Sequence, residues 1–431
     1  FDEPTIGLHQ RDTRRLINLL RRLRDHGNTV LVIEHDLEII ANADWVVEFG
    51  PGAGRHGGQI VAQGTPAQAA ADSRSLTGAY LSQRLPEMAA AAPRPAGPDW
   101  LVIRGARQHN LKNIDVRLPL HTLTAVAGVS GSGKSSLIFD ILEPALRRRL
   151  YHSAELPGAH DGIDGSAAIK ALVSIDQQPL TGLPRSNAAT YTEVFSAIRT
   201  LFAAQPEARR RGFTARQFSF NVPGGRCERC QGSGSLAVQM HFLPDAAIVC
   251  PACHGRRFTA ETLAVQYRGS DIAQVLETTI EEAHTLFAGE TALRTKLQIL
   301  EDVGLGYLQL GQPADTLSGG EAQRVKLAKA LAKRSSTHTL YLLDEPTTGL
   351  HAADSARLVR VLQRLVDGGG SVVVIEHNLE LIRCADWVIE LGPDGGAQGG
   401  YLLAEGAPEQ LIANPNSITG PYLARRSGPK D

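Results

Sequence analysis

The chain has 431 residues, of which 42% are hydrophobic and 21% charged, and its formal net charge is −1. This length allows about two to four domains. No apolar run approaches the ~20 residues that a membrane-spanning helix needs, so we expect no membrane segment. The sequence shows no signal peptide. It starts at Phe1 rather than Met and within a motif, so we expect it to be part of a longer protein.

Residues 1–82 alternate between helix and strand patterns. Apolar residues at helical spacing predict a helix from Arg11 to His26. Buried strands are expected over 29–35 and 45–49, and a hairpin edge over 57–64.

This first segment recurs, without a gap, 342 positions later. Asp2-Glu3-Pro4-Thr5 matches Asp344-Glu345-Pro346-Thr347, and Ile33-Glu34-His35 matches Ile375-Glu376-His377. A repeat of this length indicates a duplicated domain. We therefore interpret residues 1–82 as the C-terminal part of a first copy, in which Asp2, Glu3 and His35 take the places of Asp344, Glu345 and His377.

A linker is expected over 83–99, which contains four prolines and no periodicity. The second copy follows over 100–431. Strands are predicted over 101–103, 114–116 and 122–127.

A phosphate-binding loop follows the last of these strands. Gly128-Val129-Ser130-Gly131-Ser132-Gly133-Lys134-Ser135 fits G-x-x-x-x-G-K-[ST], and a helical pattern starts at Ser136. Glycines let backbone N–H groups curl around phosphate oxygens, and the helix N-terminus adds its positive dipole end. Lys134 is expected on the β- and γ-phosphates, and Ser135 on Mg²⁺. The nucleotide contacts that we predict are Gly128, Ser130, Gly131, Ser132, Gly133, Lys134, Ser135 and Ser136.

The rest of the second copy alternates strands and helices around a long insertion. Strands are predicted over 172–176, 339–344 and 371–376, and helices over 321–334 and 354–366. Such alternation is typical of an α/β domain with a mostly parallel sheet that is covered on both faces. The signature and insertion region, 141–316, is Arg-rich and loop-rich.

Four polar positions carry candidate chemistry. Asp344 and Glu345 end a buried strand, which suits Mg²⁺ binding by the first and activation of the attacking water by the second. Ser318-Gly319-Gly320 opens a helix, where exposed N–H groups can meet a phosphate. His377 ends another strand and is a candidate contact for the γ-phosphate. The alternatives are a solvated turn, a simple helix cap and a structural histidine.

Four of the five cysteines form two C-x-x-C pairs. Cys227 and Cys230 are separated by nineteen residues from Cys250 and Cys253, a spacing typical of a structural Zn²⁺ site in a reducing compartment. The zinc module is expected over 226–256. His254 is expected to be a bystander, and Cys384 to pack in the core.

The nucleotide motifs resemble those of ATP-binding-cassette ATPases. Gly128–Ser135, Gln177, Leu317–Glu321, Leu342–Thr347 and His377 match this family in order and spacing. The resemblance implies that two cassettes meet head to tail, with ATP between the phosphate loop of one and the Ser-Gly-Gly helix of the other. It also implies that Gln177 senses Mg²⁺ and the attacking water, so the catalytic set is Glu345, His377 and Gln177.

The zinc-bearing insertion resembles the UvrA family, the damage-sensing ATPase subunits of bacterial nucleotide-excision repair. Stretches such as 216–222, 240–245 and 302–307 fit as well, so the resemblance covers nearly the whole chain. It implies a cytoplasmic DNA-repair ATPase with ATP, Mg²⁺ and Zn²⁺ as cofactors. The implied partners are damaged double-stranded DNA, a UvrB-like subunit and a second copy of the full-length protein, without a membrane.

Three alternatives remain open from the sequence. A transporter ATPase would share the nucleotide motifs but not the zinc module, and a UvrA-like drug-resistance paralogue would share both. A binding-only protein is also possible, because the one phosphate loop and the one Ser-Gly-Gly motif belong, by family geometry, to different ATP sites. We therefore expect weak ATP hydrolysis by this chain alone.

The insertion also carries a local excess of positive charge. Residues 199–268 contain ten arginines and four acidic residues. Such a patch indicates a polyanionic partner, although a solvated basic face is the alternative. Arginine contacts to phosphates suit a sensor of DNA deformability, because they carry no sequence preference. The candidate DNA contacts are Arg209, Arg210, Arg211, Arg226 and Arg229.

Overall fold

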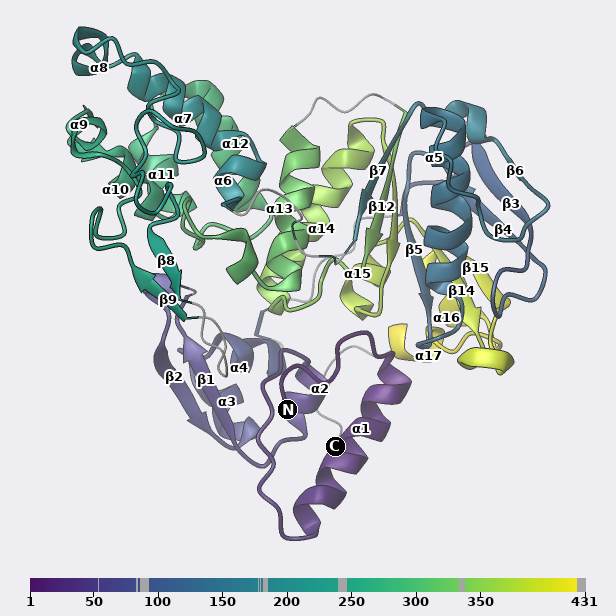
Figure 1. Cartoon of the computed structure of the whole chain (residues 1–431). Helices are drawn as coiled ribbons and strands as arrows, with labels where there is room; N and C mark the ends of the chain where they lie inside the picture. The colour runs from purple at the N-terminus through teal and green to yellow at the C-terminus, as the bar shows by residue number, and fades with distance from the viewer. Residues whose placement is uncertain are drawn as a thin grey trace. The chain divides into compact units, whose positions relative to one another are not determined.

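The fold is described from a computed structural model (Figure 1). It describes residues 1–52, 54–82, 84–85, 93–176, 178, 180, 185–238, 246–332 and 338–424. The chain divides into two compact units, the first made of Phe1–Gln177 with Arg334–Asp431, and the second of Gln178–Lys333. The second unit begins at Gln178, later than the predicted region 141–316. It also ends later than predicted, because the helix after Leu317 packs on the inserted helices.

A six-stranded sheet forms the centre of the first unit. Its order is β15-β14-β5-β13-β12-β7, and only β15 is antiparallel to its neighbour, which confirms the mostly parallel α/β sheet. Every residue of β5 and β13 is buried, as in parallel strands covered on both faces. The strands are β5 (Leu123–Gly128), β7 (Ala171–Ile175), β12 (Thr339–Asp344), β13 (Ser371–Ile375), β14 (Trp387–Gly392) and β15 (Tyr401–Gly406).

Helices and a small antiparallel sheet cover this central sheet. Figure 1 shows α5 (Glu143–Tyr151) and α14 (Ala352–Asp367) on opposite sides of it. The small sheet has the order β4-β3-β6 and, together with the π-helical segment η2 (Ser136–Leu142), completes a fully buried core on one face. The other elements here are β3 (Trp100–Ala106), β4 (Ile114–Pro119), β6 (Gly162–Asp164), η3 (Ser166–Ala168), α15 (Leu379–Arg383), η5 (Gly396–Gln398), α16 (Pro408–Ala413) and α17 (Gly420–Leu423).

Residues 1–82, within the first unit, contain a helix and a hairpin at positions equivalent to α14 and to β14 and β15 of the second copy. Helix α1 (Gln10–Asp25) and the antiparallel pair β1 (Val46–Gly50) and β2 (Gln59–Gly64) match the predicted helix and hairpin. The predicted strand over 29–35 is wrong, since only an isolated bridge joins Ile33 to Asp2. The remaining elements are α2 (Leu37–Ala41), η1 (Gly54–His56), α3 (Pro66–Ala71) and α4 (Leu76–Leu81).

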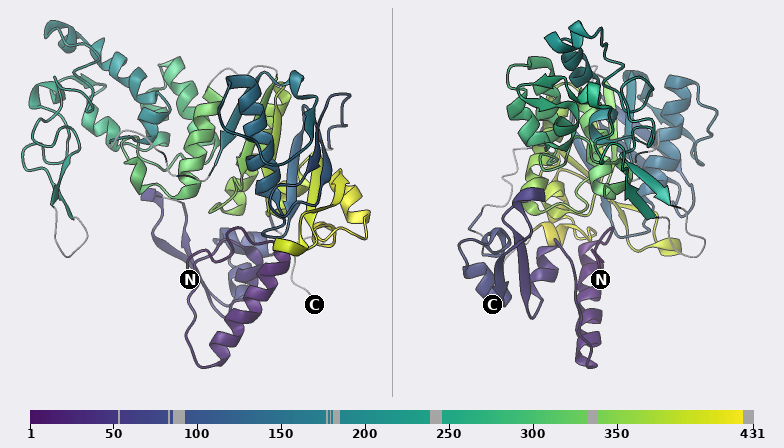
Figure 2. Two further views of the ribbon diagram at one scale, coloured as in Figure 1. Left: turned by 45° about the vertical axis from the view of Figure 1, so that its right-hand side comes forward. Right: turned by 60° about the vertical axis from the view of Figure 1, so that its left-hand side comes forward.

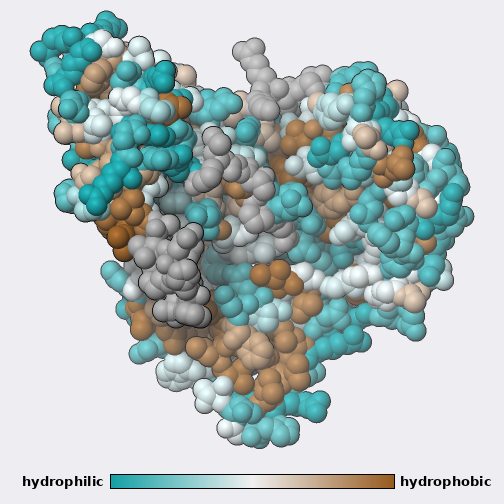
Figure 3. All heavy atoms as spheres, viewed as in Figure 1, coloured by the Kyte–Doolittle hydropathy of each residue, from teal (hydrophilic) through white to brown (hydrophobic). Residues whose placement is uncertain are grey.

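The lost strand has a physical explanation in the second copy. There β13 and β14 both pair with β5, which lies between them. The described part of residues 1–82 contains no counterpart of β5, so segment 29–35 has no strand to pair with on that side. Its apolar side chains are exposed, with Leu31 at 78% and Ile33 at 58%, against 3% and 1% for Val373 and Ile375 at the equivalent positions. Figure 3 shows hydrophobic residues gathered over this part of the chain.

The predicted linker over 83–99 lies partly outside the described residues, which lack 83 and 86–92. Its described end is held in place, because the Arg94 guanidinium forms ion pairs with Asp367 (2.6 Å) and Asp386 (3.0 Å). Among the described helices, none is both long enough and apolar enough to cross a membrane.

The second unit combines short helices and small hairpins with many turns and irregular segments, in keeping with the predicted loop-rich insertion. Its core contains stacked and tilted aromatic rings, such as Phe195 on Phe220 with centroids 4.9 Å apart. The hairpin of β8 (Ser235–Val238) and β9 (Ala246–Val249) projects from this unit (Figure 2). The other elements are α6 (Ala188–Tyr191), α7 (Val194–Ala203), α8 (Pro206–Arg210), α9 (Ala260–Leu263), β10 (Gln266–Tyr267), β11 (Ser270–Asp271), α10 (Ile272–Glu277), α11 (Ile280–Leu286), α12 (Thr291–Asp302), η4 (Ala314–Thr316) and α13 (Gly319–Ala332).

Candidate nucleotide site and metal centre

The phosphate loop, the Asp-Glu pair and the histidine meet at one edge of the central sheet. Strand β5 ends at Gly128, β12 at Asp344 and β13 at Ile375, and these three strands are neighbours. Parallel strands end at the same edge, which is where α/β folds bind their ligands. Motifs far apart in the sequence are therefore brought to a single place.

The phosphate loop makes a tight turn from β5 into η2. Its glycines have positive φ angles: 130° at Gly128, 72° at Gly131 and 104° at Gly133. A Cβ atom at Gly128 would lie 2.0 Å from the Leu391 carbonyl oxygen, so only glycine fits there.

Lys134 is buried inside this loop. Its Nζ donates hydrogen bonds to the carbonyl oxygens of Gly128 (2.9 Å) and Val129 (3.0 Å). Burial lowers the pKa of the Lys134 ammonium to about 8, although the carboxylates of Glu345 and Asp344 oppose that shift. A largely buried ammonium group with two carbonyl acceptors suits an anionic partner such as a phosphate.

The two carboxylates after β12 lie in different surroundings. Burial, together with the charges of Glu345 and Asp176, raises the pKa of Asp344 to about 6 against the opposing effect of Lys134. Glu345 adopts a φ of 45°, and its N–H donates to the Ile375 carbonyl at 2.9 Å. Oxygen ligands beside a phosphate loop fit Mg²⁺, which such sites bind through one or two carboxylates and the substrate phosphates.

His377 lies directly beside Glu345. The distance from His377 Nε2 to Glu345 Oε1 is 3.3 Å, and burial lowers the pKa of the imidazole. His377 Nδ1 is buried and has no hydrogen-bond partner among the described residues. The first copy repeats the pair, with 3.3 Å between His35 Nε2 and Glu3 Oε1. Because the same distance recurs, the histidine–glutamate contact is a feature that both copies of the repeat share.

Sequence reasoning missed Glu376, which holds these turns in place. This side chain is 2% exposed and accepts hydrogen bonds from Thr347 N (3.0 Å), Thr347 Oγ1 (2.7 Å) and His377 N (2.9 Å). Glu34 makes the same two contacts with Thr5 in the first copy. The available signal was the Ile-Glu-His repeat, in which the glutamate recurs with the histidine.

A segment of the first copy contacts the phosphate loop of the second. Ser130 Oγ donates to the Gly7 carbonyl, and a Cβ atom at Gly7 would lie 3.6 Å from both carboxylate oxygens of Glu345. The rings of His9 and His377 have centroids 6.5 Å apart. Burial lowers the pKa of His9 to about 3, so its imidazole is neutral at physiological pH.

The contacts between the two copies are reciprocal. The ring centroids of His9 and Tyr422 are 5.7 Å apart, and those of His351 and Tyr80 are 5.4 Å apart. Each pair is the other shifted by the repeat offset. Because a two-fold arrangement makes residue i contact j wherever j contacts i, the copies face each other across an approximate two-fold axis.

One ion pair breaks this symmetry. Arg11 contacts Asp394 at 2.5 Å and also donates to the Pro393 carbonyl. The equivalent positions in the repeat are Ala353 and Gly52, which cannot form such a pair. This contact therefore exists only on the side of the described phosphate loop.

The Ser-Gly-Gly motif belongs to the second unit. Helix α13 starts at Gly319, two residues before the predicted start, and Ser318 Oγ accepts a hydrogen bond from Glu321 N (3.2 Å), as an N-cap does. Glu321 in turn accepts from Ser318 N (2.8 Å) and from Tyr307 Oη (2.6 Å). The expected contact Gln177 lies outside the described residues.

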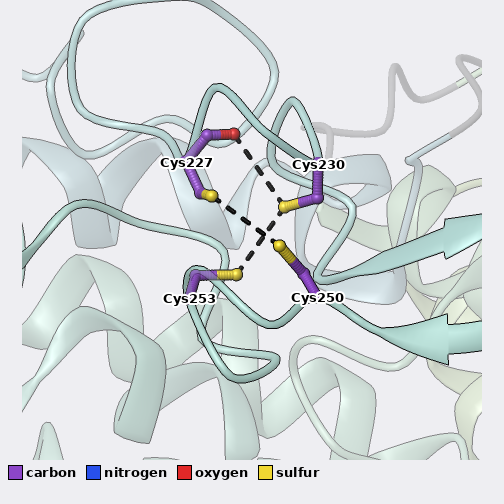
Figure 4. Close-up of side chains that lie close together, drawn as sticks. All are labelled: Cys227, Cys230, Cys250 and Cys253. Carbon is purple, nitrogen blue, oxygen red and sulfur yellow. Dashed lines mark hydrogen bonds between the residues drawn. The ribbon is translucent and has the colours of Figure 1, made fainter.

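The four paired cysteines form one buried cluster (Figure 4). Their Sγ atoms all lie within 4.8 Å of one another, with 4.0 Å between Cys227 and Cys250 and 3.7 Å between Cys230 and Cys253. Zn–S bonds of about 2.3 Å place tetrahedral sulfurs about 3.8 Å apart. The four cysteines form no disulfide, so their number, spacing and burial fit a structural Zn²⁺ ion.

Two further predictions concern His254, which is next to this cluster in the sequence, and Cys384, which lies in the first unit. His254 is exposed and is not part of the cluster, as expected of a bystander. Cys384 caps α15 and is buried in the first unit, where burial raises the pKa of its thiol to about 11. Its core-packing role is thus consistent with the structure.

The candidate DNA contacts differ in whether their side chains already form ion pairs with acidic residues. Arg209, Arg210 and Arg211 are exposed at the end of α8, but Arg210 and Arg211 both form ion pairs with Glu207. In the part of the chain that the structure describes, Arg209 has no such pair.

The two arginines at the first C-x-x-C pair, Arg226 and Arg229, also differ. The Arg226 side chain is only 11% exposed, and its guanidinium contacts Glu228 at 3.2 Å. Arg229 is exposed and, among the described residues, forms no ion pair. Arg209 and Arg229 are therefore the most available candidates.

This sheet edge, with its phosphate loop, strand-end Asp-Glu pair and histidine, defines an ATP-binding-cassette protein. A sequence family described as "ABC transporter" matches residues 255–348. The chain is 55% identical over 425 residues to UvrABC system protein A of Aquifex aeolicus, covering 99% of this chain and 46% of that protein. It is 53% identical over 427 residues to the Thermus thermophilus protein of the same name, covering 99% and 44%.

The solved structures agree with these relatives. The structure titled "UvrA2 from Deinococcus radiodurans" matches with a TM-score of 0.91 and 48% identity, covering 98% of this chain and 51% of that chain. An archaeal ABCE1 complex, at 15% identity and a TM-score of 0.50, shows the shared fold alone. The likeness to UvrA proteins extends over 98–99% of this chain, which spans about half the length of the curated relatives it matches.

The cysteine cluster predicts a stoichiometric metal. We expect the purified chain to contain about one zinc ion per molecule, because four thiolates close one tetrahedral site. Cys250→Ser removes a ligand and should release most of the zinc, whereas Cys384→Ser should retain it. Metal analysis with thiol titration measures both. Four reactive thiols without zinc in the unmodified chain would contradict the site.

The raised pKa of Asp344 predicts a pH dependence of stability. Between its ordinary pKa of 3.8 and about 6, the native carboxyl group keeps a proton that the unfolded chain has lost. The free energy of unfolding therefore falls as pH rises through this window, and the Asp344 contribution is constant above it.

Asp344→Asn should abolish this part of the dependence, so its stability relative to the unmodified chain should rise from pH 4 to pH 6. The exposed Glu409→Gln serves as control. Tryptophan fluorescence reports on the first unit in urea unfolding, because Trp45, Trp100 and Trp387 all lie there. Parallel stability curves for Asp344→Asn and the unmodified chain would refute the assignment.

Proposed function

We propose that this chain is the ATP-hydrolysing and DNA-binding part of a UvrA-type subunit in nucleotide-excision repair. The observation that carries the proposal is the convergence of Lys134, Asp344 and the Glu345–His377 pair at one sheet edge. The likeness to UvrA proteins, over nearly all of this chain, supports the choice among ATP-binding-cassette functions.

In the proposed reaction, the phosphate loop binds the nucleotide. Loop N–H groups and the Lys134 ammonium hold the phosphates, and the ammonium exchanges its two carbonyl acceptors for phosphate oxygens. Ser135 and Asp344 would hold Mg²⁺, which neutralises phosphate charge when it is bound. Glu345 accepts a proton from the attacking water, and His377 orients Glu345 and contacts the γ-phosphate. Gln177 takes part by family resemblance only.

The domain arrangement follows from the repeat. Residues 1–82 are proposed as the end of a first cassette, and 100–431 as a second cassette that carries the zinc module over 226–256. Segment 29–35 is proposed to pack beside a phosphate-loop strand that the described residues of 1–82 do not contain. The exposed apolar side chains of segment 29–35 support this, since their counterparts in the second copy pack beside β5.

The second unit is proposed to bind damaged double-stranded DNA. Its excess of arginine supplies phosphate contacts that hold a duplex without reading base edges. Such contacts suit recognition of a deformed duplex, because deformability changes at a lesion. A UvrB-like subunit, dimerisation of the full-length protein and a cytoplasmic location complete the proposal.

The transporter alternative has no support from the structure. The relatives reported above are UvrA proteins, and the likeness to the 15%-identical structure is one of fold alone. The cysteine cluster also stands in the unit that carries the Ser-Gly-Gly motif, where it adds a metal-bound module to the cassette.

The proposed mechanism predicts how ATP turnover responds to mutation. We expect this chain to bind ATP but hydrolyse it slowly, because its phosphate loop and its Ser-Gly-Gly motif serve different sites. Glu345→Gln should lower the residual rate about 100-fold while preserving ATP affinity. Lys134→Ala should weaken ATP binding about tenfold or more.

The matched control is Glu3→Gln, which removes the equivalent carboxylate from the copy without a described phosphate loop. Its turnover should equal that of the unmodified chain. Phosphate release and fluorescent-nucleotide binding measure the two quantities. Fast turnover by the monomeric chain, dependent on Glu345, would show that the site is complete and that the half-site interpretation is wrong.

The exposed arginines predict a salt-dependent DNA affinity. Replacing both Arg209 and Arg229 by Gln should weaken duplex binding and lower the slope of log affinity against log salt by about two, because each lost phosphate contact removes about one released ion. Arg226→Gln should change the slope less, since that guanidinium already contacts Glu228. Fluorescence anisotropy across a salt series measures both. An unchanged slope in the double variant would exclude these residues as phosphate contacts.

A further inference from the structure

Arg257 connects the two C-x-x-C pairs through its main chain. It belongs to none of the motifs found in the sequence. Its carbonyl oxygen accepts a hydrogen bond from Cys227 N at 2.8 Å, and its N–H donates to the Cys253 thiol. The residue adopts a φ of 70°, an uncommon conformation for a residue other than glycine. A strained residue that touches both halves of the cluster is held there by the surrounding structure.

The Arg257 side chain leaves the cluster in a defined direction. Its guanidinium lies 5.4 Å from the centre of the Phe220 ring, and Nη2 donates to the Gly311 carbonyl at 3.2 Å. Burial lowers the pKa of this guanidinium, whereas charge on Cys230, Cys253 and Glu277 opposes that shift. The Arg257 guanidinium therefore interacts both with cysteines of the cluster and with the Gly311 carbonyl.

Gly311 begins a short, well-anchored path to the Ser-Gly-Gly motif. Gly311 N donates to the Leu276 carbonyl at 2.7 Å, and a Cβ atom at Gly311 would lie 2.8 Å from that same carbonyl oxygen. Ala314 N donates to the Ser186 carbonyl at 2.8 Å before η4 ends at Thr316. Two residues later the chain reaches Ser318.

We propose that Arg257 is a positioning residue that couples the four-cysteine site to the segment leading into the Ser-Gly-Gly motif. Four thiolates around Zn²⁺ leave a net negative charge, which the Arg257 guanidinium balances, so a loaded cluster fixes the side chain that holds Gly311. Loss or distortion of the cluster loosens Arg257 and, through Gly311, the start of α13. This inference rests on the proposed function for its link to ATP and DNA, but the coupling itself lies within the second unit.

The test uses the full chain, loaded with zinc, and three variants. Arg257→Gln removes both the positive charge and the N–H donors of the guanidinium. Arg257→Lys keeps the charge near the thiolates but lacks the planar guanidinium that stacks on Phe220 and reaches Gly311. Arg256→Gln is the matched control, because the neighbouring guanidinium instead forms an ion pair with Asp271.

Two measurements separate coupling from simple structural damage. Zinc transfer to a chromogenic chelator should be about tenfold faster in Arg257→Gln, near the unmodified rate in Arg257→Lys, and unchanged in Arg256→Gln. Hydrogen exchange of peptides over 309–321 should be faster in both Arg257 variants even with zinc bound, by about threefold or more, and unchanged in Arg256→Gln.

The unmodified chain gives an independent test that survives misfolding of a variant. Removing its zinc should accelerate exchange over 309–321 as well as over 226–238. If exchange rises only over 226–238, or if Arg257→Gln behaves like Arg256→Gln in both measurements, the coupling proposal is overturned. If zinc removal alters 309–321 while neither DNA nor ATP binds the chain, the coupling stands and the proposed function fails.

Discussion

Strand β5 is the element on which the nucleotide site depends. It pairs with β13 on one side and β14 on the other, and its last residue opens the phosphate loop. Those pairings place Gly128 against Leu391 so closely that no side chain fits between them. The pairing with β13 brings His377 to this edge, and β12, which pairs with β13, brings Asp344 and Glu345 to the same edge. Where the described chain lacks a counterpart of β5, the equivalent strand pattern does not become a strand.

Buried carboxylates also hold several turns of the fold in position. Glu376 accepts hydrogen bonds from the turns that follow β12 and β13, and Glu390 accepts bonds from Ser417 and Thr419 in the turn before α17. A buried carboxylate is costly unless its oxygens are satisfied, so each holds its turn in one conformation. Glu48 makes the equivalent bonds to Ser75 and Thr77 in the first copy. The duplicated domain thus repeats its internal supports as well as its motifs.

The parts that were predictable from the sequence are those whose information is local. The phosphate loop, the strand before it and the two C-x-x-C pairs carry their signal within a few residues, and the structure forms the loop and clusters the cysteines. The strand over 29–35 was mispredicted because strand formation depends on a partner that no local pattern reveals. Glu376 and Arg257 were missed for the same reason, since their importance lies in contacts with residues distant along the chain. Arg226 has the right charge for a DNA contact, but a count of local charges does not reveal that its guanidinium pairs with Glu228.

The unshared ion pair between Arg11 and Asp394 has a consequence for how the duplicated protein has diverged. Two identical chains that meet around a symmetry axis must carry the same residues on both faces, so every change is made twice. Gene duplication within one chain removes that constraint. Here one face carries a charge pair beside its phosphate loop, while alanine and glycine stand at the corresponding places of the other. The two faces are therefore chemically distinct, and opening one of them requires breaking a contact that the other does not have.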